Sequence, residues 1–171
     1  MSEQAEKIVR QHTRWALAGG FVPVPGLDLL AVGGAQLRML AKLAEHYGVA
    51  FAENRAKSII SALAGPVVSK DIAMGTFGSL LKGIPFVGIP LGFLTLPIIS
   101  AAITQALGKV FVQHFESGQT FLDFSPEKAQ EYFKQTYDES LEVFRDLKKK
   151  REETKAAKAK KTKAKPAEAT S

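Results

Sequence analysis

A run of 26 residues without a charged side chain, residues 83–108, limits the folds open to this chain more than any other feature. About 20 apolar residues suffice for a helix to cross a bilayer, so the run is long enough to span one. Pro85 and Pro90 restrict where a helix can start, and we expect the uninterrupted apolar part of the helix only over residues 91–107. That part, roughly 17 residues, is at the short end of what can span.

Charged residues lie close to every apolar segment. Asp28 falls within the first such segment. Lys70 and Asp71 divide the second, and Lys82 directly precedes the uncharged run. A charge inside a bilayer costs about 2.5–3.5 kcal/mol on insertion scales. These side chains would therefore have to form ion pairs, extend to the membrane–water interface or lie at that interface. Shallow or hairpin insertion is therefore as consistent with the pattern as a complete span.

Three segments before the uncharged run have helical spacing of apolar residues. They cover residues 3–18, 27–47 and 51–81. We expect Gly65 and Pro66 to kink the third helix. Together with the helices that follow, they predict an all-α fold: a compact helical domain with a hydrophobic helical hairpin.

The stretch GGFVPVPGLDLL separates the first two predicted helices. Proline fixes φ and has no N–H, so Pro23, Pro25 and Gly26 predict an extended corner. Asp28 then falls in the first turn of the next helix, where a carboxylate accepts hydrogen bonds from unpaired amides at the positive helix end. We interpret Asp28 as structural, with a contact to a ligand or partner as the alternative.

The apolar stripe of the predicted helix 27–47 contains one polar side chain, Gln36. A buried amide needs a hydrogen-bond partner, and the proline corner supplies polar groups nearby. We predict that Asp28 and Gln36 form a polar pair in the fold, with a ligand contact as the alternative. Tyr47 ends the stripe, and Gly48 is the expected left-handed C-terminal cap.

Gly88 and Gly92 have the small-xxx-small spacing that lets helices approach closely in lipid. We interpret them as a packing face of a membrane hairpin or an oligomer. The alternative is a tight loop between two helices, which the neighbouring prolines favour equally.

Residues 126–151 carry the clearest helix signals. Ser125 suits the N-cap and Pro126 the first helical position, and an apolar stripe runs from Phe133 to Leu147. Beyond this stem, residues 152–171 contain no Leu, Ile, Val or aromatic side chain. We therefore predict that they are disordered.

The positive charge of the chain is confined to its C-terminal part. Residues 148–171 hold 10 Lys or Arg and 3 Glu, whereas residues 1–147 hold 13 basic and 14 acidic side chains. We expect the basic residues to contact an anionic surface, either lipid headgroups or nucleic acid, unless the tail serves only solubility. They are Lys148, Lys149, Lys150, Arg151, Lys155, Lys158, Lys160, Lys161, Lys163 and Lys165.

The residue inventory argues against catalysis. The chain has no cysteine, and its three histidines, His12, His46 and His114, share no metal-ligand spacing. It has no phosphate-binding GxxxxGK[ST] loop, since its one Gly-Lys pair is followed by valine. We predict no catalytic residue, no metal, no cofactor and no enzymatic activity.

Three segments, VPVPGLDLLAVGGAQLRMLAKLAEHYGV, KGIPFVGIPLG and QALGKVFVQHFESG, resemble the bacterial YcjF-like family of unknown function, whose domain also occurs attached to Era-like GTPases. The resemblance covers about residues 7–135. It implies an all-helical, membrane-associated domain without assigned chemistry. Because some members of this family are fused to a GTPase, the resemblance suggests that the domain acts together with a nucleotide-dependent switch protein. Because this chain lacks a phosphate-binding loop, any GTPase would be a separate partner.

We divide the chain into a domain at residues 1–125, a stem at 126–151 and a tail at 152–171. Two hypotheses for the function of these three parts follow. The first is a membrane-associated, non-enzymatic adaptor or scaffold on the cytoplasmic face, with its basic tail in the cytoplasm. The second is a soluble helical dimer or lipid-binding module whose basic tail touches nucleic acid. The N-terminal residues lack the apolar core of a secretory signal, so we expect none.

Overall fold

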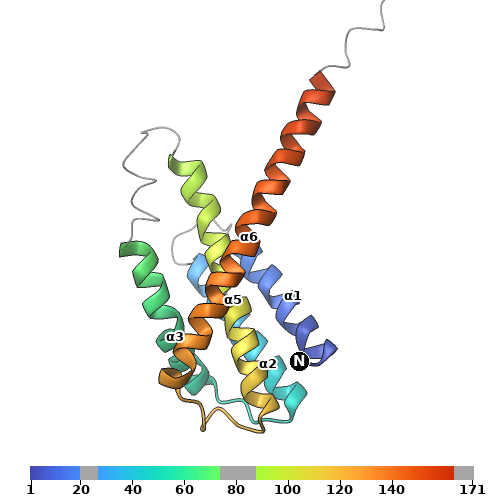
Figure 1. Ribbon diagram of the computed structural model, residues 1–171. Coiled ribbons are helices and arrows are strands. Elements are labelled where there is room, and N and C mark those ends of the chain that lie inside the picture. Colours follow the sequence, from blue (N-terminus) through green and yellow to red (C-terminus); the bar gives the residue numbers. More distant parts are fainter. Residues whose placement is uncertain (20–26, 74–87, 164–171) are drawn as a thin grey trace, which may run out of the picture.

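The computed structural model describes residues 1–19, 27–73 and 88–163, which form a bundle of α-helices (Figure 1). The described residues contain no strand, and the predicted all-α class is confirmed. Pro23, Pro25 and Gly26, and hence the predicted corner, lie outside the described residues. The helices are α1 (Glu3–Gly19), α2 (Leu27–Tyr47), α3 (Glu53–Ala73), α5 (Gly88–Glu116) and α6 (Pro126–Lys163).

Helix α5 is the centre of the bundle, because α1, α2 and α6 all pack against it. Helix α3 packs against α6 and α2. Phe111 of α5 and Phe133 and Tyr137 of α6 are among the largest fully buried side chains. The first half of α6 therefore belongs to the core, so the predicted boundary between domain and stem at residue 125 does not coincide with a boundary of the core.

The end of α2 has the geometry that its sequence predicts. Gly48 has a φ of 67°, and its N–H donates to the carbonyl of Glu45 at 3.3 Å. The N–H of Val49 donates to the carbonyl of Ala44 at 2.8 Å. These two bonds, with glycine in the left-handed region, form a helix C-terminal cap, and the prediction for Gly48 is confirmed.

Two helices are longer than the sequence suggested. Helix α5 begins at Gly88, before the expected start, because a proline in a first turn removes no hydrogen bond that the turn would otherwise make. Helix α6 continues to Lys163, so the prediction of disorder is wrong for residues 152–163. Alanine, lysine, arginine and glutamate have high helix propensity, and they extend a helix that the core has already nucleated. Lys165 lies outside the described residues.

Candidate functional site

The apolar segments of the chain converge at one end of the bundle, which we name the apolar end. In Figure 1 it is the upper end, where α3 finishes and α5 starts. The first half of α5 consists of the uncharged run from Gly88 onward. The linking residues 74–87, whose one charged side chain is Lys82, lie outside the described residues.

The C-terminal half of α6 projects past the bundle on the same side as the apolar end (Figure 1). It carries the predicted basic residues up to Lys163, and those with described exposure from Lys149 to Lys155 are exposed, whereas Lys148 is half-buried. Leu147, predicted to continue the apolar stripe, is 57% exposed because α6 has left the bundle there. A basic helical rod, the part of α6 from Lys148 to Lys163, therefore replaces the predicted disordered tail over residues 152–163.

Gly88 and Gly92 both lie within α5, so the alternative of a tight loop at these two residues is wrong. The side chains around them lie outside the described residues. Their role as a helix-packing face stays a prediction.

Gln36 finds its partner on α5. Its side-chain amide donates to the hydroxyl of Thr104 at 3.3 Å, and this hydroxyl donates to the carbonyl of Ser100 at 2.8 Å. Gln36 is 5% exposed and Thr104 is fully buried. The predicted need for a partner was right, but the partner comes from the uncharged run, whose few polar side chains were the available signal. The side chain of Asp28, in the first turn of α2, lies outside the described residues.

Tyr47 has a structural role at the lower end of the bundle. Its hydroxyl donates to a carboxylate oxygen of Glu116 at 3.0 Å, and the N-terminal ammonium lies 3.2 Å from the same oxygen. Hydrogen bonds from the ammonium and from Tyr47 lower the pKa of Glu116. His46 contributes a hydrogen bond to Ser2 at 2.9 Å. This cluster ties the chain start to α2 and α5.

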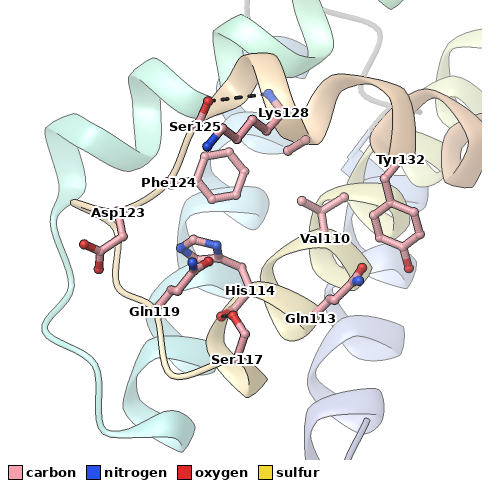
Figure 2. A pocket seen from close by; sticks show the side chains of 11 residues that line it. Val110, Gln113, His114, Ser117, Gln119, Asp123, Phe124, Ser125, Lys128 and Tyr132 are labelled. Carbon is pink, nitrogen blue, oxygen red and sulfur yellow. Dashed lines mark hydrogen bonds between the residues drawn. The ribbon is translucent and has the colours of Figure 1, made fainter.

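A groove of about 330 Å³ lies between the end of α5, the loop after it and the start of α6 (Figure 2). It contains His114, Ser117 and Asp123, the residue types of a hydrolase triad, but not the geometry. His114 Nε2 bonds the carbonyl of Thr120 at 2.7 Å, and Ser117 Oγ donates to the carbonyl of His114 at 2.6 Å. The Asp123 carboxylate accepts from the amide and hydroxyl of Thr120, which lowers its pKa. In Figure 2 this carboxylate points away from the imidazole. These contacts shape the loop and do not activate a nucleophile.

The described residues contain neither a cluster of metal ligands nor a helix that could span a membrane. No group of three or more histidine, aspartate or glutamate side chains is placed to hold a metal ion within residues 1–19, 27–73 and 88–163. None of the helices, as far as they are described, combines the length and the hydrophobicity needed to cross a bilayer.

Comparison with known protein families identifies the family of this chain. Residues 1–142 match the family described as Domain of unknown function (DUF697). The chain belongs to the DUF697 family. The resemblance to a YcjF-like family of unknown function is thereby confirmed. The DUF697 match ends within α6, before the basic half that projects from the bundle.

A relative in the same comparison is Magnetosome membrane protein 22 of Magnetospirillum gryphiswaldense (strain DSM 6361 / JCM 21280 / NBRC 15271 / MSR-1). The two sequences are 38% identical over 148 residues, which cover 86% of this chain and 76% of the relative. No solved structure matches the chain.

Proposed function

We propose that this protein is a membrane-associated adaptor or scaffold that acts without catalysing a reaction. The observation that carries the proposal is the convergence of the apolar segments and the basic half of α6 on one side of the bundle (Figure 1). The relative that is named as a membrane protein supports it. The apolar end would enter the bilayer, and the basic rod would lie along anionic headgroups on the cytoplasmic face.

The two parts contribute differently to binding. Burial of apolar side chains is insensitive to salt, whereas each Lys or Arg near an anionic leaflet contributes about 1 kcal/mol that salt screens. The rod carries no aromatic side chain among its lysines, so stacking on nucleobases is absent and nucleic acid is the weaker partner. The lower end of the bundle stays free for a protein partner. Because members of the family occur fused to Era-like GTPases, we propose a separate GTPase as this partner.

Membrane binding is tested by flotation of the full-length protein with neutral and anionic liposomes at low and high salt. The test variant replaces four basic residues of the rod by glutamine, and the matched control replaces four exposed lysines elsewhere. The test residues are Lys149, Lys150, Arg151 and Lys155. The control residues are Lys7, Lys57, Lys128 and Lys134.

We expect only the test variant to bind anionic liposomes more weakly at low salt, while the salt-resistant binding persists in both variants. A protein that floats with neither liposome contradicts membrane association. Complete release from native membranes by carbonate, together with binding to duplex DNA that the test variant loses, would favour the soluble module. Retention of a GTP-loaded Era-like GTPase from the same genome, but not of its GDP form, tests the proposed partner.

A further inference from the structure

A second groove, between α1 and α2, contains side chains that the proposed adaptor function does not use. Its volume is about 390 Å³. Helix α1 contributes His12 and Trp15, and α2 contributes Arg38, Lys42 and Glu45. Trp15 is the single tryptophan of the chain, and it lies on the surface, where it is 43% exposed.

His12 is the unusual member of this groove, since it is only 3% exposed and half of its hydrogen-bonding capacity is unused. Its Nδ1 lies 2.8 Å from the carbonyl oxygen of Ile8. A carbonyl only accepts, so Nδ1 carries the proton, and in the neutral ring Nε2 is left as an acceptor. Nε2 is buried without a partner. Desolvation, reinforced by the charges of Arg38 and Lys42, lowers the pKa of His12 and so favours the neutral ring.

Arg38 supplies an uncompensated positive charge. Lys42 is paired with Glu45 at 2.7 Å, whereas Arg38 forms none of the salt bridges among the described residues. Its guanidinium lies 5.8 Å from the centre of the Trp15 ring. His46, the remaining titratable residue of the groove, is bonded to Ser2. The groove therefore combines a positive charge at its exposed rim with a buried acceptor.

This combination selects a narrow class of ligand. The ligand must carry negative charge for Arg38 and a proton that it can donate to His12 Nε2. Sulfate and phosphodiesters are anions without such a proton near neutral pH, whereas a phosphate monoester has its second pKa near 6 and retains a P–OH group in the monoanion. We propose that the α1–α2 groove binds a phosphate monoanion, with Arg38 and Lys42 at its oxygens and its P–OH donating to His12 Nε2.

The phosphate group could belong to a soluble monoester or to a monoester headgroup in a bilayer, and the experiment separates the two. Intrinsic fluorescence of Trp15 reports binding, with calorimetry as the second measurement. The soluble probes are inorganic phosphate, glycerol 3-phosphate and sulfate, at about pH 6.5. The vesicle probes are phosphatidylcholine containing either phosphatidic acid, a monoester, or phosphatidylglycerol, a diester of equal sign. They are offered to the variant that lacks the four basic residues of the rod, so that binding by the rod does not contribute to the comparison.

We expect phosphate to bind at least about tenfold more tightly than sulfate, which has no P–OH group. In the same way, phosphatidic acid vesicles should bind at least about tenfold more tightly than phosphatidylglycerol vesicles. Arg38→Gln should weaken binding about tenfold or more, while the control Lys57→Gln, on an exposed lysine of α3, leaves it unchanged. His12→Phe should abolish the preference for the P–OH group. Binding by soluble probes assigns a soluble monoester, and binding by phosphatidic acid vesicles alone assigns the lipid headgroup. Equal affinity for sulfate and phosphate, or for both vesicles, overturns the proposal, as does no binding of any monoester.

Discussion

Replacing Gly108 by alanine should loosen the contact between α1 and α5. A Cβ atom at residue 108 would lie 2.6 Å from Cγ1, 2.7 Å from Cγ2 and 3.2 Å from Cβ of Val9. Rotation about χ1 cannot clear both methyl groups of a β-branched side chain, and Val9 is buried at 5% exposure. Overpacking costs about 1–3 kcal/mol, whereas alanine in place of glycine within a helix gains about 0.5–1 kcal/mol. The difference between these two ranges is about 0–2.5 kcal/mol, and because two methyl groups clash we expect a net loss in its upper part, about 1–2 kcal/mol, in the free energy of unfolding.

The assay is urea unfolding followed by circular dichroism, with Gly108→Ala, Val9→Ala and the double variant compared with the wild type. Because Val9→Ala removes the clashing methyl groups, the added methyl should become favourable in its presence. The double variant should thus be more stable than Val9→Ala alone, with a coupling energy of about 1 kcal/mol or more. A Gly108→Ala protein as stable as the wild type, or strictly additive effects, would refute the close packing of α1 on α5.

Four further outcomes can be measured by thermal or urea unfolding. Thr104→Val should cost about 1–3 kcal/mol because it leaves the buried amide of Gln36 unpaired, and Thr104→Ser, which keeps the hydroxyl, should cost less; equal losses would contradict the hydrogen bond. Burial lowers the pKa of His12 below 6.5, so the unfolded chain takes up a proton on this imidazole more readily than the folded chain does. The free energy of unfolding should therefore fall as the pH drops below 6.5, and the His12→Gln variant should lose the part of this pH dependence that comes from His12. Phe111→Ala should cost about 3–5 kcal/mol, since the ring is fully buried and stacks on a neighbouring ring at 4.8 Å; a loss below 1 kcal/mol would argue against this core. Leu122→Ser, at 78% exposure, should stay within about 0.5 kcal/mol of the wild type, and a larger loss would show that this side chain is packed.

Local signals were sufficient to place most helices. Helix α2 begins and ends where the sequence predicts, at Leu27 and Tyr47, and the Gly48 cap terminates it. Such signals act over a few residues, so they can be read without knowledge of the fold. The prediction of disorder beyond residue 151 failed for a related reason: composition describes an isolated segment, whereas residues 152–163 extend a helix already formed.

The candidate sites could be anticipated only in part. The sequence located the basic residues and the uncharged run, since charge and hydropathy are properties of the chain itself. It did not show that α6 directs its basic half toward the apolar end, because the direction of a helix depends on its packing partners. The α1–α2 groove was missed altogether, since a lone His12 carries no spacing signal.

The all-α class, the ends of α2 and the segregation of charge could be predicted, because they depend on residues that are close together in the chain. Which side chains are buried and which meet depends instead on how the helices pack. Gln36 bonds Thr104, 68 residues away, and Trp15 is 43% exposed although α1 packs against both α2 and α5. Periodicity shows that a helix has an apolar face, but the edges of that face are set by the helices that cover it, and those contacts join residues far apart in the chain.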